Sequence, residues 1–170
     1  AMRGCLSTEG LTDKEAISRA RSSPPMEGSD FVREVTTPGP FSWDPEGVES
    51  RSWILTPGPS QVVRNVVETS TGGDCFLPLP AANFPIVAMD FGMKRNIARL
   101  LRAHGLDVTV VPSTASPTEI LESNPSGLFL SNGPGDPAAL EYVHQTVREL
   151  LDKIPIFGIC LGHQIIALAL

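Results

Sequence analysis

The pattern of hydrophobic and polar residues changes near residue 85. Before this point, proline clusters interrupt the chain in residues 23–25, 37–40, 56–59 and 77–80. Because proline lacks a backbone N–H and breaks helices, no long helix or strand is predicted in this part of the chain. Two short elements are expected within it. One is a helix over residues 13–21, where Thr12 and Glu15 have the spacing of a capping box, and the other is an edge strand within residues 62–67.

After residue 84, four short apolar runs alternate with segments of helical periodicity. The apolar runs cover residues 86–89, 108–111, 127–130 and 156–159. Helices are expected over residues 94–104, from Ser116 and Pro117 onwards, from Asp136 and Pro137 onwards, and over residues 161–170. Apolar strands separated by amphipathic helices are typical of a parallel sheet covered on both faces. The predicted fold class is therefore α/β, with a mostly parallel sheet and helices on both faces.

In such a sheet, function is expected in the loops that follow the strands, because ligands bind beyond the carboxyl ends of parallel strands. These loops are residues 90–95, 112–116, 131–136 and 160–162. Two of them carry patterns with a chemical meaning.

The strongest pattern is Gly158-Ile159-Cys160-Leu161-Gly162, between the last predicted strand and the last helix. A Gly-x-Cys-x-Gly sequence at such a junction is the thiol counterpart of the Gly-x-Ser-x-Gly nucleophile elbow. The turn is so sharp that the residues two before and two after the nucleophile must be small. It exposes the Cys160 side chain at a helix N-terminus, where the partial positive charge favours a thiolate. An inert buried cysteine is the alternative, and the two glycines argue against it.

The second pattern is the glycine loop, residues 131–136, with the sequence Ser-Asn-Gly-Pro-Gly-Asp. Two glycines after a strand allow backbone N–H groups to approach a ligand closely. In acyl transfer, such donors stabilise the negative oxygen of the tetrahedral intermediate. A plain turn that ends in a helix start at Asp136 and Pro137 is the alternative. Next to a cysteine elbow, the oxyanion role is the stronger interpretation.

Residues 158–164 resemble the cysteine motif of the class I, triad-type glutamine amidotransferases, and residues 132–137 resemble their glutamine-binding loop. Together with residues 89–96 (Met-Asp-Phe-Gly-Met-Lys-Arg-Asn), they are similar to one branch of that family, the small glutaminase subunits of carbamoyl-phosphate synthetases. The resemblance covers nearly all of residues 84–170. Residues 30–37 and 41–43 also resemble the end of the amino-terminal domain in that branch, though less specifically.

The resemblance implies roles for five positions. Cys160 is the nucleophile that attacks the glutamine carboxamide, and the backbone N–H groups of Leu161 and Gly133 form the oxyanion hole. The residues that bind glutamine are Gly133, Gly135, Leu161 and Gln164. The ammonia passes through an internal tunnel to a large synthetase subunit, or a fused synthetase domain, which uses bicarbonate and ATP. No metal or cofactor is expected in this chain, and ATP and Mg²⁺ are expected on the synthetase partner.

Catalysis of this kind needs a histidine base and a carboxylate that orients it. The resemblance places both in a His-Pro-Glu segment downstream of the elbow, and residues 161–170 contain no such segment. The chain is therefore expected to be an internal piece of a longer protein, truncated at both ends, unstable and nearly inactive alone. His163 is expected to cap or pack, His104 to end its helix, and His144 to lie on a solvated face.

Two cations at the start of the helix over residues 94–104 are ambiguous. Lys94 and Arg95 lie at the ligand-side end of the first strand, where the family resemblance also marks Asp90. Positive charges at a helix N-terminus are slightly unfavourable. A carboxylate partner is therefore expected for them, either Asp90 or a group on another subunit.

Composition narrows the function classes. The chain has 170 residues, of which 41% are hydrophobic, so it can bury a core. Its 13 basic and 19 acidic residues give a net charge of -6, which argues against a nucleic-acid partner. No apolar run is long enough for a membrane helix, so no membrane partner is expected. Three cysteines without close spacing argue for a reducing compartment. A cytoplasmic location is expected, with organellar targeting left open because the chain begins without Met.

Three segments are expected along the chain. Residues 1–55 are a C-terminal remnant of an amino-terminal domain, residues 56–84 are a Pro/Gly-rich linker, and residues 85–170 are the first part of the amidotransferase domain. Two alternatives to a glutaminase stay open: a different elbow-cysteine hydrolase acting on another amide or ester, and a non-catalytic scaffold that binds a synthetase. The intact Cys160 argues against the scaffold. Arginine and pyrimidine synthesis are both compatible with the product.

Overall fold

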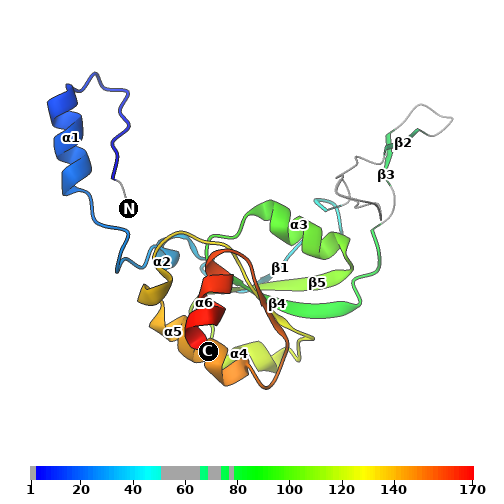
Figure 1. Ribbon diagram of the computed structural model, residues 1–170. Coiled ribbons are helices and arrows are strands. Elements are labelled where there is room, and N and C mark those ends of the chain that lie inside the picture. The colour runs from blue at the N-terminus through cyan, green and yellow to red at the C-terminus, as the bar shows by residue number, and fades with distance from the viewer. Residues whose placement is uncertain (1–2, 51–65, 69–73, 77–78) are drawn as a thin grey trace.

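The computed structural model describes residues 3–50, 66–68, 74–76 and 79–170 (Figure 1). Its centre is a five-stranded sheet. The strands are β1 (Phe41–Ser42), β4 (Phe84–Asp90), β5 (Leu106–Pro112), β6 (Leu128–Leu130) and β7 (Ile156–Gly158). They lie in the order β1-β5-β4-β6-β7, and every neighbouring pair except β1 and β5 is parallel. The predicted mostly parallel α/β sheet is confirmed, and the four predicted strands are β4 to β7.

Helices cover both faces of this sheet, as predicted. α3 (Arg95–Ala103) packs on one face, where Ala98, Val108 and Phe129 form part of a buried cluster. α4 (Pro117–Glu122), α5 (Glu141–Leu150) and α6 (Leu161–Ala169) cover the other face. The larger core lies beneath these three helices and includes Met89 and Leu130. The carboxyl ends of the parallel strands are thereby held at one edge of a packed layer.

Two helix starts follow the local rule that the sequence indicated. α1 (Asp13–Ser22) and α4 both begin at capping boxes. In each, a hydroxyl accepts the N–H of the glutamate three residues later, and that glutamate bonds back to the cap. Thr12 pairs with Glu15 in this way, and Ser116 pairs with Glu119.

The longer helix predicted from Asp136 is wrong as a single element. Asp136 caps a 3₁₀ turn over Pro137–Ala139, and α5 begins only at Glu141. Leu140 between them has φ −102° and ψ 46°, outside the helical range, and its side chain is buried in the larger core. The chain therefore leaves the helical path where Leu140 enters the core.

The segment before residue 51 contributes to the sheet, which the sequence pattern did not reveal. β1 adds an antiparallel edge strand to β5, and the following Trp43 is 7% exposed in the cluster beneath α3. Val32 in α2 (Val32–Val35) is fully buried in the larger core. These contacts hold residues 32–43 against the sheet. The division of the chain into three segments stays a prediction.

Two elements stand away from this body in Figure 1: α1, and a hairpin of β2 (Val66–Glu68) and β3 (Asp74–Phe76). No residue of α1 is buried. The strand predicted within residues 62–67 is confirmed for residues 66 and 67, whereas residues 62 and 63 lie outside the described residues. In the described part of the chain, no helix has the length and apolar content needed to cross a membrane.

Candidate active site

Cys160 lies between β7 and α6 in a strained backbone conformation. Its φ of 54° and ψ of −109° fall outside the regions that L-residues ordinarily adopt. The residue occupies the N-cap position of α6 without a side-chain hydrogen bond, and its thiol is free and exposed. The structure therefore shows the sharp elbow that the sequence predicted, and not the buried cysteine of the alternative interpretation.

Close backbone contacts require both glycines of the elbow. A Cβ atom at Gly162 would lie 2.7 Å from the carbonyl carbon of Leu130 and closer still to its oxygen. A Cβ atom at Gly158 would lie 2.5 Å from the carbonyl carbon of Gly162 and 2.6 Å from the amide nitrogen of His163. Such contacts are too short for any side chain, so α6 can approach β6 and β7 only with glycine at both positions.

The glycine loop lies directly beside the elbow. A Cβ atom at Gly133 would lie 2.7 Å from Phe91 Cβ and 2.8 Å from Leu161 Cδ2, so the loop fits between the turn after β4 and the start of α6. The N–H groups of Gly133 and Leu161 donate no hydrogen bond to any other described residue. An exposed thiol and two unpaired donors thus gather at the carboxyl edge of the sheet. This set suits attack on a carbonyl carbon whose oxygen becomes negative.

The other two predicted binding residues lie on either side of this pair. Gln164 is exposed in the first turn of α6, and its N–H donates to the Cys160 carbonyl at 3.1 Å. Gly135 has φ 104°, a conformation that glycine adopts without strain, and a Cβ there would lie 3.2 Å from the Ser29 carbonyl oxygen. Gln164 therefore shares the helix turn of Cys160, whereas Gly135 lies against the N-terminal segment.

Asp136 joins the end of the glycine loop to that N-terminal segment. Its Oδ2 accepts the Gly28 N–H at 2.9 Å, and its Oδ1 accepts the Ala138 N–H at 3.0 Å. These bonds, that of Gly28 foremost, lower the pKa of the Asp136 carboxyl because they stabilise its charged form. The sequence indicated only a helix start at this residue, and nothing in its local pattern pointed to Gly28.

Asp90 organises the loop after β4 rather than a charge pair. Its Oδ1 accepts the N–H groups of Gly92 and Met93 at 2.9 and 2.7 Å. Its Oδ2 accepts the Thr37 N–H at 2.8 Å. The carboxylate is therefore occupied by backbone donors, and it ties the turn after β4 to the segment before β1.

The carboxylate partner of Arg95 is Glu49 and not Asp90, whereas no ion pair of the described residues includes Lys94. An Arg95 guanidinium nitrogen lies 3.8 Å from Glu49 Oε1, and the guanidinium stacks over the Trp43 ring at 5.8 Å from its centroid. Arg99, one turn later, also pairs with Glu49 at 3.5 Å. The expectation of Asp90 is wrong for Arg95, because the turn after β1 brings Glu49 to the helix, and the expectation of a group on another subunit stays a prediction.

Two residues of the glycine loop hold the neighbouring loops, and the sequence indicated no individual role for either. Asn132 accepts the Lys94 N–H at 3.0 Å with Oδ1 and donates to the Gly92 carbonyl at 3.1 Å with Nδ2. Ser131 is fully buried, and its hydroxyl bonds to Phe91 and to the Asn132 carbonyl. Three of these bonds, those to Phe91, Gly92 and Lys94, link residues about 40 positions apart, so no local pattern could have identified them.

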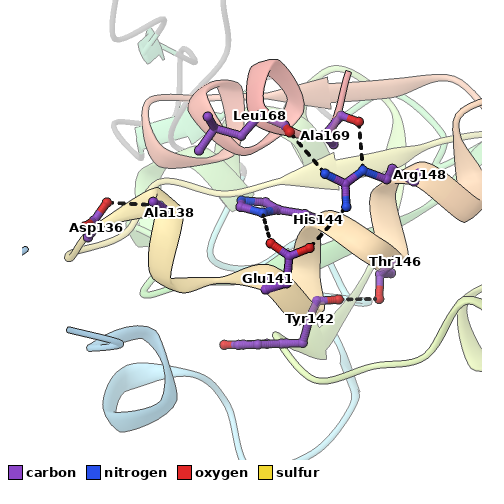
Figure 2. A network of polar contacts seen from close by, with 9 residues as sticks. All are labelled: Asp136, Ala138, Glu141, Tyr142, His144, Thr146, Arg148, Leu168 and Ala169. Atoms are coloured by element: carbon purple, nitrogen blue, oxygen red, sulfur yellow. Dashed lines mark hydrogen bonds and ion pairs between the residues drawn. The ribbon is translucent and has the colours of Figure 1, made fainter. Parts of the chain in front are cut away.

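His144 lies inside the protein, contrary to the predicted solvated face. It is 3% exposed, and its Nδ1 lies 3.3 Å from Glu141 Oε2 (Figure 2). Arg148 bonds the same carboxylate and the carbonyls of Leu168 and Ala169 at the end of α6. α5 packs against both α4 and α6, so its buried arc is wider than the apolar stripe indicates.

The other two histidines lie near the surface. His104 is the C-cap of α3, as predicted. His163 is exposed and makes no side-chain hydrogen bond within the described residues, so the expected capping or packing role is wrong. In the described ranges, no hydrogen bond or ion pair joins a histidine to Cys160. The same ranges contain no group of three or more His, Cys, Asp or Glu placed to hold a metal ion.

Comparison with known proteins adds a family and several relatives. The family model "Glutamine amidotransferase class-I" matches residues 87–170. The small chain of carbamoyl phosphate synthase from Syntrophotalea carbinolica is 44% identical over 170 residues, which is 100% of this chain and 40% of the relative. The small chain from Akkermansia muciniphila is 46% identical over 170 residues, which is 100% of this chain and 39% of the relative. The Escherichia coli K12 small chain is 40% identical over 171 residues, covering 99% of this chain and 40% of its own length.

This chain thus spans about 40% of the length of the curated relatives that it matches. A solved structure from Thermoplasma acidophilum, described as one subunit of a GMP synthase, is 32% identical with a TM-score of 0.43. That match covers 51% of this chain and 44% of the other.

Proposed function

The chain belongs to the class I glutamine amidotransferases through residues 87–170, and we propose that it carries the glutaminase site of a carbamoyl-phosphate synthase. The site hydrolyses glutamine through a cysteine thioester and supplies ammonia to a synthetase subunit or fused synthetase domain. That partner makes carbamoyl phosphate from bicarbonate and ATP. The observation that carries the proposal is the exposed Cys160 in its strained elbow beside two unpaired backbone donors.

The chemistry follows from the positions of the thiol and the two donors. Cys160 Sγ attacks the carboxamide carbon of glutamine, a C–S bond forms, and the carbonyl electron pair moves to oxygen. The N–H groups of Leu161 and Gly133 bind that negative oxygen. The C–N bond then breaks, and the nitrogen takes a proton and leaves as ammonia. Water attacks the resulting thioester, which releases glutamate and restores the thiol.

The proton transfers in these steps need a base beside Cys160. The described histidines make no bond to this residue, and His144 is buried with its Nδ1 beside Glu141 of the same helix. We therefore assign the base and its orienting carboxylate to residues outside these 170, as the family resemblance implies. The elbow and the glycine loop supply the nucleophile and the oxyanion donors.

The remaining assignments concern the substrate and the partner. Gln164 and Gly135 bind glutamine: Gln164 presents an exposed amide in the first turn after Cys160, and Gly135 allows close backbone approach. The relatives are small chains of their enzymes, which supports a larger synthetase partner. ATP and Mg²⁺ belong to that partner.

The test is glutamine-dependent ammonia release by the longest natural chain that contains these residues, with and without its synthetase partner. Cys160→Ser is expected to lower the rate by about 10⁴-fold or more, because a missing nucleophile cannot be replaced by its neighbours. Cys5→Ser, at another exposed free cysteine, is the matched control and should keep the full rate. Unchanged release by Cys160→Ser would contradict the proposal. Absence of release with the partner present would favour a different hydrolase or a scaffold.

A further inference from the structure

Ser131 connects three segments of the candidate site from one buried position. It follows β6 directly, and its residue exposure is 0%. Its Oγ accepts the Phe91 N–H at 2.9 Å and donates to the Asn132 carbonyl oxygen at 2.8 Å. Its own carbonyl accepts the Gly162 N–H at 3.1 Å. The turn after β4, the glycine loop and the first turn of α6 are therefore all bonded to this serine.

The bond to the Asn132 carbonyl also fixes the direction of the next N–H group. The carbonyl of Asn132 and the N–H of Gly133 belong to the same peptide unit, which is planar and trans. In a trans peptide these two groups point in opposite directions. The Ser131 hydroxyl holds the carbonyl on the buried side, so the Gly133 N–H must point away from it.

The carbonyl of Ser131 limits the separation of the two proposed oxyanion donors. It accepts the N–H of Gly162, the residue after Leu161, and so ties the first turn of α6 to Ser131. Gly133 lies only two residues after Ser131 in the glycine loop. The Leu161 side chain also packs against Gly133, where a Cβ would lie 2.8 Å from Leu161 Cδ2. The donor groups of Gly133 and Leu161 are thereby held in one arrangement before a substrate binds.

We propose that Ser131 is a positioning residue for the oxyanion hole: its hydroxyl aims the Gly133 N–H, and its carbonyl sets the distance to the Leu161 N–H. This inference rests on the proposed function, because it takes those two N–H groups as the donors to the oxyanion. Ser131 itself does not contact glutamine. A serine hydroxyl has one proton, and that proton is used on the Asn132 carbonyl.

A hydroxyl in this place also stabilises the fold, and the test must separate the two roles. Ser131→Ala removes both side-chain bonds and leaves the N–H of the fully buried Phe91 without its acceptor. Ser116→Ala is the matched control, because it makes the same chemical change and also removes two side-chain bonds, at the start of α4. Ser131→Thr keeps the hydroxyl and tests for rescue.

The assay measures kcat and KM for glutamine hydrolysis by the longest natural chain with its synthetase partner, normalised to the titrated Cys160 thiol. Loss of a single oxyanion donor costs about 10²–10³-fold in kcat, and a misdirected donor should cost about 10- to 100-fold. We expect Ser131→Ala to show this loss with KM changed less than about threefold, and Ser131→Thr to recover most of it. Ser116→Ala should retain the wild-type kcat.

Three results would overturn the inference: wild-type kcat in Ser131→Ala, an equal loss in Ser116→Ala, or a Ser131→Ala protein that does not fold. The last result would make the hydroxyl a purely structural group. Crystal structures of the wild type and Ser131→Ala add a measurement that needs no turnover. A peptide 132–133 rotated from its wild-type plane supports the positioning role, and an unchanged plane overturns it. Absence of glutamine hydrolysis by the wild type would instead refute the proposed function and leave this structural comparison decisive.

Discussion

Replacement of Gly162 by alanine tests whether the approach of α6 to β6 sets the catalytic geometry. The new Cβ would lie 2.7 Å from both the carbonyl carbon and the Cβ of Leu130, where ordinary contact begins at 3.4 Å. The start of α6 must therefore move by at least roughly 0.7 Å, and by more to clear the still closer Leu130 carbonyl oxygen, since the neighbouring strand is buried. If the shift falls along the bond from the Gly162 N–H to the Ser131 carbonyl, its 3.1 Å length grows to at least about 3.8 Å, which breaks it.

Two opposing contributions decide the stability of this variant. Alanine favours a helix over glycine by about 1 kcal/mol, whereas an inserted methyl group in a packed core costs about 1–3 kcal/mol. The clash here is with backbone, which cannot rotate away, so we expect a net loss of about 1–2 kcal/mol in the free energy of unfolding. The rate is more sensitive, because a misplacement near 1 Å in an active site costs about 10²-fold. We expect kcat for glutamine hydrolysis to fall about 10- to 100-fold.

The assay is ammonia release together with urea unfolding, on the longest natural chain that contains these residues. Gly39→Ala is the matched control, because a Cβ at Gly39 meets no atom within 4 Å and its φ is ordinary. This control should keep both the rate and the stability. Wild-type kcat in Gly162→Ala would show that α6 can move without misplacing Cys160, and the steric reasoning for the elbow would then be wrong.

Two further predictions concern the packing of the N-terminal segment and the loss of folding stability at acidic pH. Trp43→Ala should lower the free energy of unfolding by about 3–5 kcal/mol, since the ring is buried beneath α3. Phe41→Ala should lower it less, because Phe41 is 43% exposed. Equal losses of the two variants in urea titrations would contradict this prediction. The hydrogen bonds from His144, and then Arg148, lower the pKa of Glu141 below its ordinary 4.5. A depressed carboxyl pKa gives stability that is present above the ordinary value and lost as pH falls through the lowered one. Urea unfolding from pH 7 to pH 3 should show the difference between wild type and Glu141→Gln shrinking below pH 4.5, and a constant difference would refute the linkage.

The parts of this fold that the sequence predicted are those governed by local rules. The elbow at Cys160 could be predicted because sterics demand glycine two residues before and after it. The starts of α1 and α4 could be predicted because a hydroxyl and a glutamate three residues apart satisfy each other. In each case the partners are close in sequence, so the pattern itself contains the interaction.

The parts that escaped prediction depend on partners far apart in the sequence. Glu49 reaches Arg95 only because β1 pairs with β5, and no local signal marks a two-residue strand. His144 has polar neighbours in its helix, and its burial follows from the packing of α5 between α4 and α6. The hydroxyl of Ser131 bonds to Phe91, 40 positions away. Such contacts can be found only once the sheet has assembled.

The burial of Val32 and Trp43 constrains how related proteins can exchange parts of their genes. These side chains fill the two opposite cores of a sheet whose central strands all come after residue 83. A recombination point within residues 51–78 would join Trp43 and strand β1 of one protein to the sheet of another protein. The core of that sheet is shaped for different side chains, and close-packed cores tolerate such mismatches poorly. A recombination point between α1 and Gly28 separates a helix that buries no residue and keeps the bond from Gly28 to Asp136. Residues 32–50 and the sheet are therefore expected to be inherited together, although a proline-rich stretch separates them in the sequence.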